Sequence, residues 1–201
     1  IRDRYYINRF KKGLTSVKTK KINDINLNRW KEYDDILTDS LWVLDKRDNS
    51  GAHNASYWGN FIPQIPNQFI RRYTKKDEWV LDTFLGSGTT LMESRRLGRN
   101  SIGIEIQSTV AKMARQNIDK DTNLFSSDSR SEIIVGDSMN INYEEELKRI
   151  GIEKVQLAIM HPPYWDIKKF SEDENDLSNA KSIEDFSKGF NKILKNVYEV
   201  L

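Results

Sequence analysis

The sequence predicts an α/β protein built on a mostly parallel β-sheet. From Trp79 onward, short apolar runs alternate with amphipathic stretches, a pattern typical of parallel strands joined by helices. Four candidate strands also end in distinctive polar residues, namely Asp82, Glu105, Asp137 and His161. Because ligands of such sheets bind outside the carboxyl ends of the strands, the same residues predict a binding site.

Composition limits the classes of protein that this chain can belong to. Its 201 residues suffice for one domain, or for one domain with appendages. The chain has no cysteine, which excludes disulfides, thiolate metal sites and a cysteine nucleophile. No apolar run approaches the roughly 18 residues of a membrane span, and no signal peptide opens the chain. We therefore expect a cytoplasmic protein without a metal site, and a first residue other than Met predicts a trimmed start or a piece of a longer protein.

The first 29 residues are basic, with nine Lys or Arg against two Asp, and Tyr5, Tyr6 and Phe10 are interleaved among them. One interpretation is an arm that contacts nucleic acid. The other is a solvated leader whose aromatic side chains pack on the body. Residues 30–44 follow with apolar positions typical of an amphipathic helix.

The remaining elements follow from periodicity and from local start and stop signals. Gly98 and Gly151 are predicted to end helices, and Ser182 with Asp185 forms a capping box that begins the last one. Residues 61–66 are predicted to be extended and stiffened by proline. Strands are expected at residues 78–82, 101–105, 133–135 and 155–160, and helices at residues 67–73, 89–97, 109–118, 143–150 and 182–200.

A glycine turn follows the first of these strands. Gly86 and Gly88 permit positive φ and close approach of a ligand to the backbone, and Thr89 and Thr90 can cap the next helix. The turn lacks the lysine of a phosphate-binding P-loop, and Leu91 replaces the third glycine of the dinucleotide fingerprint. Taken alone, this stretch is either an ordinary turn or a binding site.

The acids at the next two strand ends favour a binding site. Glu105 lies about twenty residues beyond the turn, which is the spacing of an acid that accepts hydrogen bonds from ribose hydroxyls. Asp137 is placed to accept from an adenine amino group. The ligand is therefore expected to be an adenosine compound without a pyrophosphate.

At this point the sequence resembles a known family. Residues 82–90, Asp-Thr-Phe-Leu-Gly-Ser-Gly-Thr-Thr, are similar to the D-x-F-x-G-x-G-T-T signature of S-adenosylmethionine-dependent DNA amino-methyltransferases. The run His161-Pro162-Pro163-Tyr164 resembles their catalytic (D/N/S)-P-P-(Y/F/W) tetrapeptide. Residues 61–72 resemble the cofactor motif that precedes the turn in some members. The resemblance covers roughly residues 58–166.

The resemblance implies a Rossmann-like methyltransferase fold with a mostly parallel sheet of seven strands, and this chain is expected to lack the last ones. It divides the chain into a basic N-terminal arm and helix, residues 1–56, and a partial methyltransferase domain, residues 57–201. Three explanations stay open: a fragment of a longer enzyme, half of a split enzyme completed by a second chain, or a module that binds cofactor or nucleic acid without turnover.

The resemblance also implies site residues. S-adenosylmethionine would be held by Phe61, Pro63, Asp82, Phe84, Gly86, Gly88, Thr89, Thr90, Glu105, Ile106, Asp137 and Ser138. Simpler structural roles stay open for several of them: helix caps for the two threonines, core packing for Phe61, and a solvated strand end for Glu105. Tyr57 and Trp58 are predicted to pack rather than bind, and His53 is predicted to be a loop histidine.

The implied reaction transfers a methyl group to adenine N6 or cytosine N4 of DNA, within a restriction-modification or related system. In the family, the first side chain of the tetrapeptide and the next carbonyl accept hydrogen bonds from the target amine. Here these groups are His161 and the Pro162 carbonyl, while Pro163 stiffens the loop and Tyr164 stacks on a base flipped from the duplex. Methylation of an amine or amide in RNA or protein is the alternative.

His161 departs from the usual Asp, Asn or Ser. A neutral imidazole accepts one hydrogen bond, whereas a protonated one accepts none. If His161 is the acceptor, activity falls as the pH drops through its titration range. If His161 only shapes the pocket, the Pro162 carbonyl does this work alone. Because of this departure, the sequence does not separate adenine from cytosine as the target.

Overall fold

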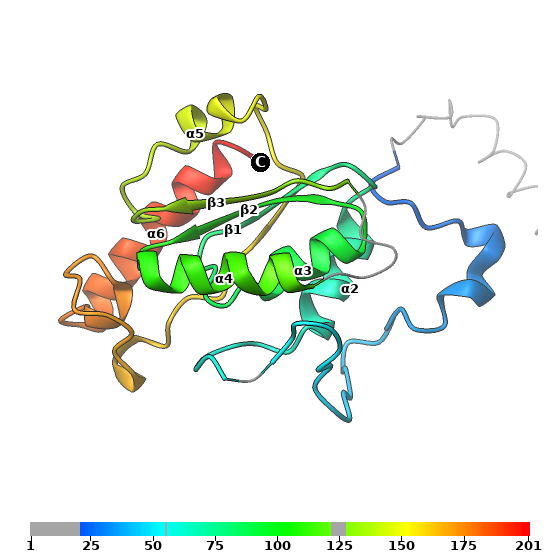
Figure 1. Cartoon of the computed structure of the whole chain (residues 1–201), viewed down its shortest axis with the longest axis horizontal. Helices are drawn as coiled ribbons and strands as arrows, with labels where there is room; N and C mark the ends of the chain where they lie inside the picture. The colour runs from blue at the N-terminus through cyan, green and yellow to red at the C-terminus, as the bar shows by residue number, and fades with distance from the viewer. Residues whose placement is uncertain (1–20, 55, 122–127) are drawn as a thin grey trace, which may run out of the picture.

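The computed structural model describes residues 21–54, 56–121 and 128–201 (Figure 1). Most of the basic arm predicted from the sequence therefore lies outside the described residues. The elements in chain order are η1 (Leu27–Tyr33), α2 (Gln64–Tyr73), β1 (Trp79–Asp82), α3 (Thr89–Arg96), β2 (Asn100–Glu105), α4 (Ser108–Lys120), β3 (Ser131–Val135), α5 (Tyr143–Arg149), β4 (Leu157–Ile159), η2 (Trp165–Ile167), η3 (Leu177–Asn179) and α6 (Ile183–Tyr198).

The four strands form one parallel sheet in the order β3-β2-β1-β4. Val80 of β1 is paired with Ser101 of β2 on one side and with Leu157 of β4 on the other. This is the strand order of the first part of a Rossmann-like sheet. The first three strands are added towards one edge, and β4 is then added on the other side of β1, so the direction of strand addition reverses between β1 and β4. The predicted α/β class is confirmed. All four carboxyl ends lie at one edge, and the reversal opens a crevice there.

Helices cover both faces of the sheet (Figure 1). On the face of α3 and α4, a cluster forms around Leu91 and Ile118. On the opposite face, Leu81 and Ile102 pack with side chains of α5 and α6. Fully buried aliphatic side chains of this kind each stabilise the fold by about 1.5–3 kcal/mol. A parallel sheet between two layers of helices is buried on both faces, and therefore requires short runs of apolar residues such as these.

One glycine in β2 lets the turn after β1 pack against the sheet. A Cβ atom on Gly103 would lie 2.5 Å from Cδ1 of Leu85, and the Leu85 N–H donates to the Ile104 carbonyl at 3.0 Å. The turn is therefore fixed against β2 as well as by its own chain. No residue larger than glycine fits at position 103 without displacing Leu85.

Two predictions for the region before the sheet are wrong. Residues 30–44 do not form an amphipathic helix, because the described structure has only the short 3-10 helix η1 there, with Trp30 66% and Leu41 77% exposed and thus no apolar face to bury. Residues 61–66 are not extended throughout, because α2 already begins at Gln64. Pro63 is its N-cap and Pro66 lies in its first turn, where the missing N–H has no helical partner to lose.

The predicted start of the last helix is confirmed, since the Ser182 hydroxyl accepts from the Asp185 N–H at 3.1 Å. Among the residues that the structure describes, every helix is too short or too polar to cross a membrane.

Candidate functional site

A pocket lies at the carboxyl edge of the sheet, over the reversal point. Eleven of the residues predicted for the site line it: Phe61, Phe84, Gly86, Glu105, Ile106, Asp137, Ser138, His161, Pro162, Pro163 and Tyr164. They come from the ends of all four strands and from the segment before α2. The sheet order thus brings together residues that are up to a hundred positions apart in the sequence.

The other five predicted residues lie beside the pocket and do not line it. Pro63 begins α2. Asp82 is 1% exposed, and its Oδ1 accepts from the Phe84 N–H at 3.0 Å. Gly88, Thr89 and Thr90 form the start of α3, and the two threonines are buried. Asp82, Gly88, Thr89 and Thr90 therefore belong to the strand end and the start of α3 on either side of the turn.

The glycine turn has the backbone geometry that its sequence predicts. Gly86 and Gly88 have φ of 52° and 92°. Gly88 is the N-cap of α3, so neither threonine caps the helix with its side chain, contrary to the sequence expectation. Instead the hydroxyls of Ser87 and Thr89 donate to Oδ1 of Asn60, at 2.6 and 3.1 Å. Asn60 thereby ties the segment before α2 to the turn.

Glu105 ends β2 and faces the turn. Its two carboxylate oxygens accept from the backbone N–H groups of Gly86 and Gln107, each at 3.0 Å. Burial raises the pKa of Glu105 to about 7, and these two hydrogen bonds oppose the rise. A carboxylate has about four lone-pair directions, so capacity to accept from a ligand hydroxyl is left.

Asp82 shares this environment. Complete burial raises the pKa of Asp82 to about 6, while the hydroxyl of Thr90 and the N–H of Phe84 favour its charged form. Because Asp82 is buried and does not line the pocket, Glu105 is the carboxyl group of this pair that can accept from a hydroxyl-bearing ligand.

The residues after β3 connect the ends of two strands. Ser138 donates from its hydroxyl to the Thr83 carbonyl at 2.6 Å, and its own carbonyl accepts from the Tyr143 hydroxyl at 2.9 Å. Asp137 accepts from the Met139 N–H at 2.8 Å, which fixes its position at the pocket wall. A ligand lying across the edge of the sheet would contact this wall at one end and the glycine turn at the other.

The tetrapeptide after β4 closes the other side of the pocket. His161 Nε2 lies 2.7 Å from the Tyr164 hydroxyl, and its ring centroid lies 4.9 Å from that of Phe61. Partial burial lowers the pKa of His161, so the imidazole is neutral at pH 7. Tyr164 is 61% exposed at the rim, where it can meet a planar ligand that enters from outside.

Several lining residues were not predicted from the sequence. The Tyr57 ring lies against Gly86, with Cε1 3.0 Å from the position of a Cβ there. Trp58, which also lines the pocket, is 64% exposed, with Lys168 Nζ 4.5 Å from its ring centroid. That Tyr57 and Trp58 pack rather than bind stays a prediction. Phe170 and Asp176 complete the wall beyond the tetrapeptide. No local signal marks these residues, because they reach the pocket only through the path of two loops.

Comparison with known proteins agrees with this geometry. A family model described as DNA methylase matches residues 2–116, which is more than half of the chain. Two relatives are the type II methyltransferases M2.DpnII of Streptococcus pneumoniae, 32% identical over 104 residues, and M2.LlaDCHI of Lactococcus lactis, 33% identical over 98 residues. The matches cover 48% and 46% of this chain, but only 39% and 33% of those proteins.

The fold also resembles solved structures. A S-adenosylmethionine-dependent methyltransferase from Methanosarcina mazei matches with a TM-score of 0.44 and 20% identity, over 66% of this chain and 51% of that one. On the extent of the family match, this chain belongs to the DNA methylase family.

Proposed function

We propose that this protein transfers a methyl group from S-adenosylmethionine to an exocyclic amino group of a DNA base, adenine N6 or cytosine N4. The observation that carries the proposal is the single pocket edge that joins the glycine turn, Glu105, Asp137 and the tetrapeptide His161 to Tyr164. Because the chain spans well under half of its two relatives, a further part of the protein or a second chain is proposed to complete the enzyme.

The residues present fit the cofactor. Glu105 retains lone pairs for ribose hydroxyls, and Asp137 lies where it would accept from the adenine amino group. The turn at Gly86, with its positive φ, gives the methionine end close access to the backbone. When bound, S-adenosylmethionine supplies a methyl group that is electrophilic because it is carried by a sulfonium.

The tetrapeptide would act on the acceptor amine. The lone pair of an exocyclic amine is delocalised into the ring, so the nitrogen is a poor nucleophile until its protons are held by acceptors. A neutral His161 and the Pro162 carbonyl would provide two such acceptors, and the lowered pKa of His161 keeps the imidazole competent at neutral pH. Tyr164, largely exposed at the rim, would stack on the flipped base.

A contact within the tetrapeptide occupies Nε2, one of the two ring nitrogens of His161. If the Tyr164 hydroxyl accepts from Nε2–H of His161, Nδ1 is the nitrogen that can accept from the amine. This tautomer leaves the hydroxyl proton of Tyr164 available to the DNA. The 2.7 Å contact therefore orients both the acceptor and the stacking residue.

The experiment measures binding and transfer separately. Calorimetry with S-adenosylmethionine is expected to show one site, and incubation with methyl-labelled cofactor is expected to label unmethylated duplex DNA, not RNA or protein. Absence of cofactor binding would refute the proposal. Binding without transfer would assign the chain to a catalytically incomplete part of an enzyme, and labelling of RNA or protein alone would replace DNA as the substrate.

Three finer assignments belong to the same proposal. The protein is expected to act in the cytoplasm and within a restriction-modification or related system, a proposal supported by the two relatives' being type II methyltransferases. The division into residues 1–56 and 57–201 stays a prediction, although Ser50 and Ala52 already contact the body through Arg96 and Asp121.

A further inference from the structure

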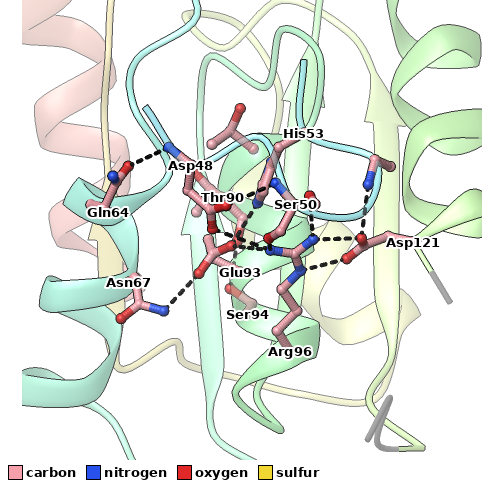
Figure 2. Close-up of polar contacts among 12 residues, drawn as sticks. Asp48, Ser50, His53, Gln64, Asn67, Thr90, Glu93, Ser94, Arg96 and Asp121 are labelled. Atoms are coloured by element: carbon pink, nitrogen blue, oxygen red, sulfur yellow. Dashed lines mark hydrogen bonds and ion pairs between the residues drawn. The ribbon is translucent and has the colours of Figure 1, made fainter. Parts of the chain in front are cut away.

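A polar cluster outside the pocket lining joins α3 to the segment before α2 and to the end of α4 (Figure 2). Its centre is Arg96, which donates through Nε and Nη2 to the two carboxylate oxygens of Asp121, at 2.8 and 2.7 Å. The same guanidinium donates to the Ser50 carbonyl at 2.8 Å and to the Ser50 hydroxyl at 3.0 Å. Arg96 thus joins the end of α4 to the segment before α2.

The cluster continues through Glu93, one turn earlier on α3. Its Oε1 lies 2.6 Å from His53 Nε2, and its Oε2 accepts from the Asn67 amide at 2.7 Å. His53 lies in a loop, as the sequence predicts, and its side chain is fully buried. The other ring nitrogen of His53 has no hydrogen-bond partner among the described residues, so Glu93 alone orients the imidazole.

The cluster holds the segment before α2 through contacts with Ser50, Ala52 and His53. Burial acts to raise the pKa of Asp121, but the hydrogen bonds from Arg96 and from the Ala52 N–H, together with the charge of Arg96, outweigh it and the net pKa is lowered. The contact is also tight, since a Cβ atom on Gly51 would lie 2.3 Å from Arg96 Nη2. A displaced segment would remove the contacts of Arg96 with Ser50 and of Glu93 with His53, and would leave polar groups of a buried site without those partners, which is unfavourable.

The segment held in this way forms one wall of the pocket. We call residues 47–54 and 56–61 the wall segment. Arg47 donates to the carbonyls of Asn54 and Phe61, at 3.1 and 3.0 Å, which ties its two ends together. Its far end carries Tyr57 against Gly86, and Asn60 under the hydroxyls of the glycine turn.

We propose that Glu93, Arg96 and Asn67 are positioning residues for cofactor binding. They do not line the pocket, and they act by holding the wall segment against the glycine turn. This inference rests on the proposed function, since it assumes that the methionine end of S-adenosylmethionine lies at that turn. The proposed effect of this buried network on α3 is specific to the part of the cofactor site that would hold the methionine end.

The test compares two ligands on three variants. S-Adenosylmethionine carries the amino acid end, whereas methylthioadenosine has the same adenine, ribose and sulfur without it. Arg96→Lys removes the bidentate pair of hydrogen bonds to Asp121. Asn67→Ala removes one hydrogen bond to Glu93 from a partly buried site. Arg149→Lys is the matched control, because Arg149 forms an exposed ion pair on α5.

Dissociation constants are measured by calorimetry, at a temperature where circular dichroism shows each variant folded. Arg96→Lys is expected to weaken S-adenosylmethionine about tenfold, and Asn67→Ala a few-fold, because residues of one network are coupled by such amounts. Methylthioadenosine should change by less than about twofold, and the control should change neither ligand. If Arg96→Lys does not fold, the Asn67→Ala result decides.

Two results would overturn the inference. Unchanged affinity for S-adenosylmethionine in a folded Asn67→Ala or Arg96→Lys variant would show that the cluster has no effect on the site. Equal losses for both ligands would show a general loss of structure instead of positioning at the methionine end. Failure of the unsubstituted protein to bind S-adenosylmethionine at all is a distinct result, which removes the proposed function itself.

Discussion

The carboxyl group of Glu105 makes cofactor affinity depend on pH in a direction that the structure determines. Its pKa is raised to about 7 by burial. Ribose hydroxyls donate most strongly to the ionised form, so binding should favour deprotonation. In the free protein, the carboxyl group of Glu105 is about 90% ionised at pH 8 and about 10% ionised at pH 6. The affinity for S-adenosylmethionine is therefore expected to fall about tenfold between these values.

The substitution that tests this is Glu105→Gln, which keeps the shape and removes the titrating group. One of the two N–H groups of Gly86 and Gln107 would then face an amide NH₂, and charge-assisted hydrogen bonds to the ligand are lost. At pH 8 the variant should bind about 10- to 150-fold more weakly, the equivalent of about 1.5–3 kcal/mol. Its remaining affinity should no longer follow the Glu105 titration.

Calorimetry at pH 6, 7 and 8 in buffers of different ionisation enthalpy measures both the affinity and the protons released. Glu132→Gln is the matched control, because Glu132 lies on β3 outside the pocket lining and forms a surface ion pair with Arg130. Equal dissociation constants for the unsubstituted protein at pH 6 and pH 8 would refute the reasoning. So would a Glu105→Gln variant that keeps the full pH dependence.

Three further predictions concern stability and activity. The pKa of Asp82 in the folded protein is raised to about 6, so the contribution of Asp82 to stability is greatest below pH 4 and declines as the pH rises through 6. In denaturant unfolding, Asp82→Asn should therefore raise the free energy of unfolding by up to about 3 kcal/mol at pH 8 and leave it unchanged near pH 4. An unchanged pH dependence of stability in the variant would contradict this. Gly103→Ala should destabilise the protein by about 1–3 kcal/mol, because the new Cβ overlaps Leu85, and an equal unfolding midpoint would show that the turn adjusts freely. The lowered pKa of His161 predicts that methyl transfer persists at neutral pH and falls in more acidic solution, whereas His161→Asn should transfer without this dependence. A flat profile from neutral pH to pH 5 in the unsubstituted protein would exclude His161 as the acceptor.

The strands and most helices could be predicted from the sequence because their apolar runs are short, regular and bounded by glycine or charge. The residues around Trp30 show where such reasoning fails. Their apolar spacing suits a helix, but no neighbouring surface covers it, and Trp30 stays exposed. The prolines of residues 61–66 led to the opposite error, since an extended segment was predicted where α2 already begins. A proline such as Pro66 in the first turn of a helix is compatible with that helix.

The site divides in the same way. Glu105, Asp137 and His161 were predictable because a parallel sheet places all its strand ends at one edge. Asn60 and Tyr57 were not, since their place at the pocket depends on a loop that the sequence alone does not position. The contact of His53 with Glu93 was not predicted for the same reason, because Glu93 lies 40 residues further along the chain.

The most direct test of the central claim is the identity of the methylated nucleoside. Duplex DNA is incubated with the protein, together with any part or subunit that completes it, and with methyl-labelled S-adenosylmethionine, and is then digested and separated by mass. The account predicts label in N6-methyldeoxyadenosine or N4-methyldeoxycytidine, and loss of that label when Tyr164 is replaced by Ala. Label in 5-methyldeoxycytidine, or none in DNA while the cofactor is bound and the complete protein is present, would contradict it.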